Sequence, residues 1–359
     1  MAFPKAANYN QLANGAFSPV IYSKKVQKAF RKSSVIEDVT NTDYWGEISQ
    51  MGDSVRIIKE PDIDVSSYAR GTQLATQTLT DQDFSMVIDQ ANYYQFAIDD
   101  IEAAHSHVNF QDLATDRAAY KLKDHFDAHC LGYISGWTSS TSQGTTTWSR
   151  NTTVNGSKAN TSAGADELLP DNKLDITHFG GSDLGGTSEV TSVAVRSTTT
   201  AGGIATPLSM LNRIGRLMDQ ANVDTEGRWV VCDPVWYEIL MDEDSKFINA
   251  DYLPNSGSNT LYNGKVSSNT IRGFRIYKSN NLPYVGTGPG TTATGGSETN
   301  FGVIVAGHDS AMATAQTMNK TETFRSPDTF ADVVRGVQMF GRKILRPECL
   351  FTVNYNKHS

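Results

Sequence analysis

The sequence predicts an α+β protein, and three observations support this class. Residues 54–58 and 84–88 alternate apolar and polar side chains, as strands with one buried face do. Across residues 99–135, apolar side chains recur every three or four positions, which predicts a helix of about 30 residues, about 45 Å long. From residue 206 onward, short apolar strand patterns alternate with helical ones, and no tandem repeat is present.

Length and charge limit the classes of protein that the chain can belong to. It has 359 residues, of which 38% are hydrophobic, and a formal net charge of −8. This length supports a sizeable core divided into lobes, and the modest apolar share implies much surface, loop or interface. An acidic chain is not built to grip nucleic acid by its phosphates, because that requires clustered Lys and Arg. It can still enclose nucleic acid.

The cysteines and the apolar runs predict where the protein is found. Cys130, Cys232 and Cys349 are far apart and odd in number, so we expect reduced, mostly buried thiols in a cytosolic setting. A disulfide framework or zinc site is not expected. The N-terminus has no apolar signal segment, and no run of 18 apolar residues predicts a transmembrane helix.

The first element that the pattern predicts is a short basic helix over residues 19–31, after a polar arm over residues 1–17. Its polar face is either an ordinary solvated surface or a surface that docks on an acidic neighbour. The candidate contact residues on this face are Lys24, Lys25 and Lys28.

The second predicted element is a long two-stranded arm. Between strand patterns 54–58 and 84–88 lie about two dozen polar, turn-prone residues. A two-stranded ribbon alone is marginally stable in water, so the arm needs a partner.

The long helix follows the arm. Acidic residues in its first turn, Asp99, Asp100 and Glu102, suit the helix dipole. Lys123 and Asp127 form an i,i+4 pair that we expect on its outer surface.

Residues 137–205 are crowded with Ser, Thr, Gly and Asn, and predict an exposed insertion, either loop-rich or a small β module. Short β segments are expected within it, at 145–149 and 189–195.

The second half of the chain predicts an α/β lobe. Thr206 caps a helix that Pro207 begins. The remaining predictions are a strand at 228–234, a short helix after it, a strand at 273–279, a glycine-rich loop at 284–300, a strand at 301–310 running into a helix at 310–316, and two closing strands within 335–355.

Motifs for catalysis are weak. His125 and His129 share a helix face, and Asp124 or Asp127 lies nearby, but no third metal ligand and no HExxH glutamate is indicated. The loop at 286–291 lacks the last glycine of a dinucleotide fingerprint, and phosphate-loop and nucleophile-elbow motifs are missing. We therefore expect no enzyme, no catalytic residues, no metal and no cofactor.

The order of these parts resembles the major capsid protein of tailed bacteriophages, with the Hong Kong 97-type shell fold. Three stretches are similar to that family: RWVVCDPVWYEILMDEDSKFINADYL, SNTIRGFRIYKSNNLP and AMATAQTMNKTETFRSPDTFADVVRGVQMFGRKILRPECLF. The resemblance covers most of the chain. The sequence differs from the family at residues 137–205, and related shell proteins carry insertions at various places.

The resemblance implies a division of the chain. The expected parts are an N-terminal arm and short helix at 1–45, an extended β-arm at 46–95, the spine helix of a peripheral domain at 96–136, the insertion at 137–205, an axial α/β domain at 206–330, and closing strands of the peripheral domain at 331–359.

The resemblance also implies a function. Copies of the chain would form pentamers and hexamers of an icosahedral head that encloses phage double-stranded DNA without sequence-specific binding. Scaffolding protein, portal and a cement protein are the expected further partners, and the virion capsid, assembled in the host cytoplasm, is the expected location. The half-buried face of the arm would lie on a neighbouring copy. Charged arm residues that would pair with that copy are Lys59, Glu60, Asp62, Asp64 and Arg70.

Two alternatives of other classes remain. One is a metal-dependent or hydrolytic enzyme that uses His125 and His129. The other is a different virion protein, such as a decoration or fibre protein, for which the Ser/Thr/Gly-rich block at 137–205 would be suitable.

Overall fold

The computed structural model describes residues 34–44, 54–59, 63–71, 73, 76–78, 82–100, 110–142, 145–151, 168–181, 192–197, 204–242, 270–289, 300–327 and 329–358. The predicted basic helix at 19–31, with Lys24, Lys25 and Lys28, lies outside these residues, as do Glu60 and Asp62. Of Lys59, only the backbone is described.

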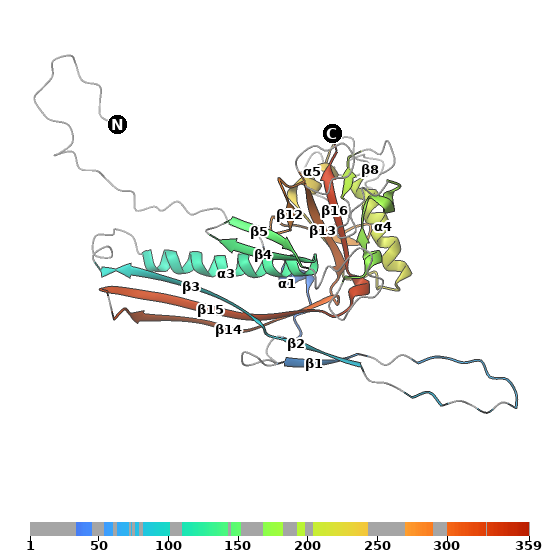
Figure 1. Cartoon of the computed structure of the whole chain (residues 1–359), viewed down its shortest axis with the longest axis horizontal. Helices are drawn as coiled ribbons and strands as arrows, with labels where there is room; N and C mark the ends of the chain where they lie inside the picture. The colour runs from blue at the N-terminus through green and yellow to red at the C-terminus, as the bar shows by residue number, and fades with distance from the viewer. Residues whose placement is uncertain are drawn as a thin grey trace, which may run out of the picture.

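The larger lobe is built on a nine-stranded mixed sheet (Figure 1). Its main strand order is β10-β11-β9-β13-β16-β7-β8, and β12 and β6 pair with β13 and β16 beside this path. The strands are β6 (Lys173–Leu174), β7 (Val193–Val195), β8 (Ile204–Ala205), β9 (Arg228–Cys232), β10 (Thr270–Ile271), β11 (Phe274–Lys278), β12 (Tyr284–Val285), β13 (Phe301–His308) and β16 (Phe351–Lys357).

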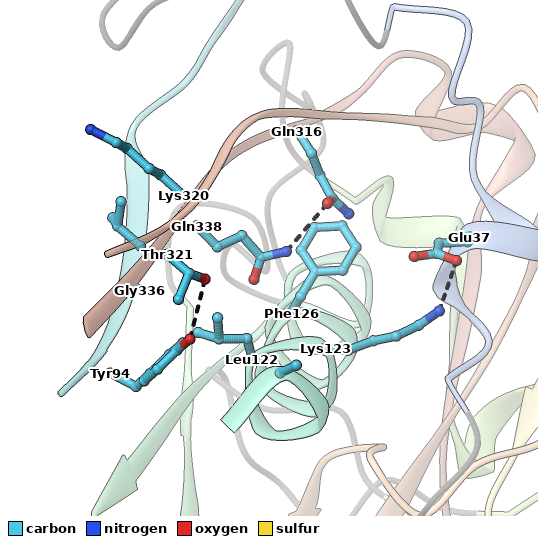
Figure 2. A pocket seen from close by; sticks show the side chains of 12 residues that line it. Glu37, Tyr94, Leu122, Lys123, Phe126, Gln316, Lys320, Thr321, Gly336 and Gln338 are labelled. Atoms are coloured by element: carbon cyan, nitrogen blue, oxygen red, sulfur yellow. Dashed lines mark hydrogen bonds and ion pairs between the residues drawn. The ribbon is translucent and has the colours of Figure 1, made fainter. Parts of the chain in front are cut away.

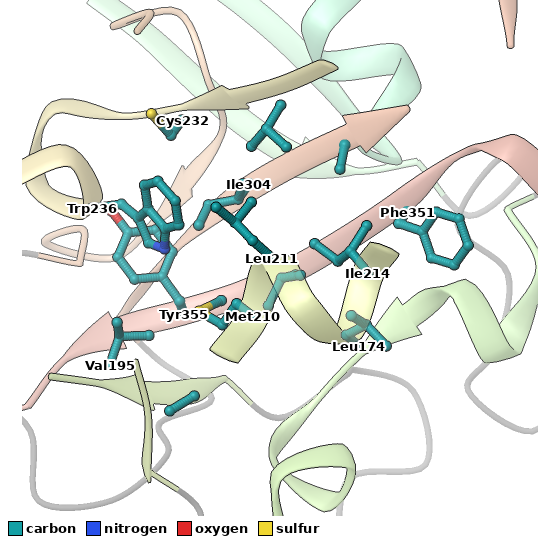
Figure 3. Close-up of a cluster of buried hydrophobic side chains, with 14 of the residues drawn as sticks. Leu174, Val195, Met210, Leu211, Ile214, Cys232, Trp236, Ile304, Phe351 and Tyr355 are labelled. Atoms are coloured by element: carbon teal, nitrogen blue, oxygen red, sulfur yellow. The ribbon is translucent and has the colours of Figure 1, made fainter. Parts of the chain in front are cut away.

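Among the described residues, two helices cover the core of this lobe, and the first of them begins where the sequence predicts. Thr206 Oγ1 accepts a hydrogen bond from the Ser209 amide at 3.2 Å at the start of α4 (Pro207–Gln220). Asp233 accepts one from the Trp236 amide at 3.1 Å at the start of α5 (Pro234–Leu240). Figure 3 shows the apolar face of α4 packed against side chains of the sheet, including Ile304, Phe351 and Tyr355.

A three-stranded antiparallel sheet forms the second part of the molecule. It consists of β14 (Met312–Arg325), β15 (Ala331–Ile344) and β3 (Gln90–Asp99), in the order β14-β15-β3. The long helix α3 (Phe110–Ile134) lies along it (Figure 1), and Phe126 packs edge-to-face on Phe340 with ring centroids 5.0 Å apart. Near its C-terminal end, α3 meets the hairpin of β4 (Trp137–Ser142) and β5 (Thr145–Arg150).

One predicted helix boundary and one whole predicted helix are wrong. The predicted long helix starts at residue 99, but Asp99 ends β3, whose side chains alternate in burial and whose backbone pairs with β15. Residues 310–316 were predicted to enter a helix, yet β14 begins at Met312. The run AMATAQTM has good helix formers, and its pairing with β15 overrides that propensity because pairing is decided by tertiary contacts.

The predicted exposed insertion at 137–205 is wrong for its described C-terminal part. There β6 and β7 both pair with β16, and β8 pairs with β7. Leu174, Val193 and Val195 are fully buried in the core of the larger lobe. Strands of two or three residues are too short to show a period, which is why composition dominated the prediction. The predicted β segment at 145–149 is confirmed as β5.

The two sheets also cross the predicted domain boundaries. Residues 206–330 were assigned to one α/β domain, but β14 within them belongs to the three-stranded sheet. Residues 331–359 are predicted to belong to the peripheral domain. Of the two strands in this range, β15 belongs to the three-stranded sheet, whereas β16 is central in the nine-stranded sheet. Two closing strands around Arg346 and Pro347 are confirmed.

The state of the thiols agrees with the sequence prediction. Cys130, Cys232 and Cys349 are buried and free, as predicted. In the described part of the chain, we find no helix whose length and hydropathy would let it cross a membrane.

Candidate subunit interface

The arm is an antiparallel hairpin with the predicted strands. β1 (Ser54–Lys59) pairs with β2 (Gln82–Val87), and Val55 lies opposite Met86. In Figure 1 the arm extends from its base in one direction, and the three-stranded sheet extends from the same region in the other. Among the described residues, the buried contacts between the arm and the rest of the chain lie at the base of the arm.

The base of the arm is buried against the same chain. Met86 is fully buried and Ile88 almost so, and both pack in a cluster with Ala313, Ala315 and Met339 of β14 and β15. Val55 and Ile57 add to this cluster from β1. The alternation predicted from the sequence is confirmed. Its expected partner is wrong for this segment, because the apolar face lies on the chain's own sheet and not on a neighbouring copy.

Gly341 of β15 makes this close packing possible. A Cβ atom at this position would lie 2.7 Å from the Val87 carbonyl oxygen and 3.1 Å from Ile88 Cγ1. Any side chain would therefore push the arm base away from the sheet. No local pattern in the sequence indicates this role, since the glycine sits in an otherwise ordinary strand pattern.

The tip of the arm carries the exposed surface. All described residues between 63 and 78 are exposed. They include Asp64 and Arg70, which are predicted from the sequence to contact a neighbouring copy. The Asp64 amide donates to Gln77 Oε1 at 3.1 Å and so joins the two sides of the arm. Three large apolar side chains are also exposed here, and one of them, Val65, is 97% exposed; the others are Ile63 and Tyr68.

Exposed apolar side chains grouped on a projecting arm indicate a contact with another molecule. Ile58 at the end of β1 extends this group, and it is also largely exposed. Sequence reasoning stressed the charges and missed these residues. The sequence shows that these apolar residues are present. Only the structure shows that the arm does not fold back over them, so that they stay exposed.

A second exposed surface lies on the three-stranded sheet, on the face turned away from α3. Tyr93 of β3 is 80% exposed there and borders an open hollow of about 430 Å³ with Gln95, Lys320 and Arg335. Glu322 pairs with Lys320 and Arg335, and these two cations lower the pKa of its carboxyl to about 2. The surface thus combines an aromatic ring with a fixed set of charges, and sequence reasoning missed it.

On its other face, the sheet does not close fully against α3. A cavity of about 290 Å³ lies between them (Figure 2). Glu37 and Lys123 form an ion pair of 3.0 Å at one side. Tyr94 lies over Gly336, where a Cβ atom would be 2.4 Å from the ring, and its hydroxyl is 3.3 Å from Thr321 Oγ1. These are packing contacts.

The predicted outer pair of Lys123 and Asp127 is wrong. Lys123 pairs with Glu37, and Asp127 is fully buried. Its Oδ1 accepts hydrogen bonds from the Val35 and Ile36 amides at 2.8 and 3.0 Å, at the start of α1 (Ile36–Val39). A buried carboxylate requires such partners, so the helix face that Asp127 occupies is an internal one.

The two histidines proposed for a metal site are packed side by side. The rings of His125 and His129 have centroids 6.4 Å apart, and His129 also meets Phe340 edge-on at 5.3 Å. Burial lowers the pKa of His129 to about 3. Among the described residues, no group of three His, Cys, Asp or Glu side chains could hold a metal ion.

Comparisons with known proteins give no sequence family. No family model matches the chain, and a search of the curated proteins gives no match.

Comparison with solved structures gives matches over nearly the whole chain. A structure titled for Mycobacterium phage Che8 is 19% identical, with a TM-score of 0.64, covering 95% of this chain and 98% of its own. The capsid structure of cyanophage P-SCSP1u is 20% identical, with a TM-score of 0.61 and coverages of 96% and 94%. The mature capsid of bacteriophage PhiM1 is 14% identical, with a TM-score of 0.61 and coverages of 94% and 92%. The chain therefore has the fold of bacteriophage capsid proteins.

Proposed function

We propose that this chain is the major capsid protein of a tailed bacteriophage, with the Hong Kong 97-type fold, and that it forms the shell of the head. The observation that carries the proposal is the structural match to a phage protein over nearly the full length of both chains, 95% of this chain and 98% of the other. Its copies assemble into pentamers and hexamers that tile an icosahedral head around double-stranded DNA. The acidic chain, with its net charge of −8, encloses the DNA without gripping its phosphates.

Assembly in this proposal depends on the arm. Its base is fixed to the subunit by Met86 and Ile88, and its tip, with Ile63, Val65 and Tyr68, lies on an adjacent copy in the same ring. The open face of the three-stranded sheet offers an aromatic ring, Tyr93, and the cations Lys320 and Arg335, which suit a tip that carries apolar groups and Asp64. Repeated heterologous contacts of this kind close rings.

The two parts of the subunit take different places in the shell. The nine-stranded lobe meets its copies around each ring axis, and α3 with the three-stranded sheet forms the outer part. Scaffolding protein, portal and a cement protein are the further proposed partners. Assembly takes place in the host cytoplasm, and the final location is the virion capsid.

The first experiment tests assembly. The chain is expressed with any scaffolding partner and analysed by sedimentation and negative-stain electron microscopy. Closed shells, or rings with five-fold and six-fold symmetry, are the expected result. A persistent monomer or dimer with metal-dependent turnover would overturn the proposal in favour of an enzyme.

The second experiment tests the arm. Residues 60–80 are replaced by a short Gly-Ser turn, which leaves the buried base intact. We expect a folded subunit that assembles poorly. Shells of normal yield and stability would show that the arm has no such role.

A further inference from the structure

The joint where the arm leaves the three-stranded sheet is held by an ion pair. Asp89 lies between β2 and β3, and its Oδ1 accepts a hydrogen bond from Arg342 Nη1 of β15 at 3.1 Å. The Arg342 guanidinium lies 4.6 Å from the ring centroid of Tyr133 on α3. One arginine therefore connects the arm base, the sheet and the long helix.

Two histidines of α3 lie beside this arginine. His129 packs edge-on against Phe340, two residues before Arg342 on β15. His125 lies one turn earlier, and its Nδ1 is 3.0 Å from Asn92 Nδ2 of β3. Both rings thus lie between α3 and the strands that hold the arm.

The charges around these rings oppose protonation. Burial lowers the pKa of His129 to about 3, and the positive charge of Arg342 and a protonated His125 add to this effect, while Asp89 acts against it. Burial also lowers the pKa of His125, and Asp124 acts against that shift. Among the described residues, the charges that shift the pKa of the two histidines include Asp124 on α3, Asp89 at the arm base and Arg342 on β15, and Lys121 of α3 lines the same hollow as His125.

We propose that the His129 and His125 pair is a proton-sensitive latch: protonation forces α3 away from Arg342, loosens the pair of Arg342 with Asp89, and releases the base of the arm. A proton on His129 would put a second positive charge beside Arg342 in a buried site, so proton uptake requires the joint to open. The consequence for shell assembly rests on the proposed function, but the opening of the joint in a single subunit does not.

Proton linkage sets the size of the effect. If the open joint restores the ordinary histidine pKa of 6.5 and the closed joint keeps the value of about 3, the opening constant rises about tenfold for each pH unit between them. For His129 alone, lowering the pH from 7.5 to 5.0 increases opening about thirty-fold.

The test is amide hydrogen exchange followed by mass spectrometry on the full, unassembled chain at pH 7.5 and 5.0, after correction for intrinsic exchange rates. Peptides covering residues 82–92 report the arm base, and β13, deep in the nine-stranded sheet, is the reference. We expect about thirty-fold more opening of the arm base at pH 5.0, as calculated above, with β13 little changed. Equal increases in both regions, or an increase below about threefold at the arm base, would overturn the proposal.

Two variants separate the latch from a packing role. His129→Gln keeps a polar side chain that cannot take up this proton, so the opening of its arm base should increase less between pH 7.5 and pH 5.0 than that of the natural chain. Asp89→Asn removes the exposed partner of Arg342 and should open the arm base already at pH 7.5. A pH response of His129→Gln equal to that of the natural chain contradicts the latch. Because no assembly is measured, failure here is distinct from failure of the capsid proposal.

Discussion

Asn281 donates a hydrogen bond from Nδ2 to Oδ2 of the buried Asp127 at 2.9 Å, although the two residues are 154 positions apart. Asp127 belongs to α3, and Asn281 lies in the connection between β11 and β12 of the nine-stranded lobe. The other carboxylate oxygen holds the start of α1. This one carboxylate therefore fastens the long helix to the larger lobe.

Removal of the Asp127 carboxylate is expected to destabilise the subunit. Asp127→Ala leaves buried amide donors without an acceptor and should lower the free energy of unfolding by about 3–5 kcal/mol. Asp127→Asn keeps the volume but loses the charge, and should cost about 1.5–3 kcal/mol. Denaturant unfolding of the purified subunit measures both.

The matched control for Asp127 is the exposed Asp43. Asp43→Asn should change the free energy of unfolding by no more than about 0.5 kcal/mol. If Asp127→Asn were as mild as this control, the carboxylate would not be a fastening point.

Addition of one methyl group at Gly341 is expected to displace the arm base. Gly341→Ala places a Cβ within 2.7 Å of the Val87 carbonyl oxygen, so we expect a loss of about 1–3 kcal/mol in stability and faster hydrogen exchange at residues 82–92. The control is Gly215→Ala in α4, where the nearest atom to a Cβ is Phe274 Cε2 at 3.6 Å. This second variant should be stabilising by up to about 1 kcal/mol, because alanine favours the helix. A tolerated Gly341→Ala with an unchanged arm contradicts the packing described for the base.

Polar substitution at the tip of the arm is expected to impair assembly but not folding. The variant changes Ile63, Val65 and Tyr68 together to serine, and since these side chains are exposed, its unfolding midpoint should stay unchanged. Shell yield, measured by sedimentation, should fall strongly because the apolar contact with the adjacent copy is lost.

Two control variants test whether the loss of assembly is caused by the loss of the apolar side chains. Alanine at Ser66, Ser67 and Thr76 changes the same exposed arm without removing apolar groups, and it should assemble normally. Neutralisation of Asp64 and Arg70 should have a smaller effect than the apolar variant, because exposed ion pairs contribute little. A larger effect of the charge variant would show that charge, and not the apolar side chains, dominates the contact at the tip.

Acid is expected to remove the stabilisation from Glu322. Its pKa falls from 4.5 to about 2 on folding, because Lys320 and Arg335 favour the charged form. The contribution to stability is therefore complete above pH 4.5 and is lost as the pH falls toward 2. The natural chain should unfold at higher denaturant than Glu322→Gln at pH 7, and this difference should shrink at pH 3 and in high salt. A difference that is independent of pH would rule out the ionic origin.

The candidate interface could be predicted from the sequence only in part. The period-two patterns at both ends of the arm gave β1 and β2 correctly, and the charges Asp64 and Arg70 are exposed as expected. The role of Gly341 and the exposure of Tyr93 were not predictable, because they depend on which strands lie beside them, and no local pattern records this.

Local sequence is enough to specify the elements that depend on near neighbours along the chain. The caps Thr206 and Asp233 start α4 and α5, and side-chain alternation marks the hairpin, since both effects act within a few residues. Only the folded chain shows which sheet each strand joins. It placed β14 in the three-stranded sheet, β6 and β7 beside β16 and β8 beside β7, and it buried Asp127, because these outcomes depend on pairing and burial between residues far apart in sequence.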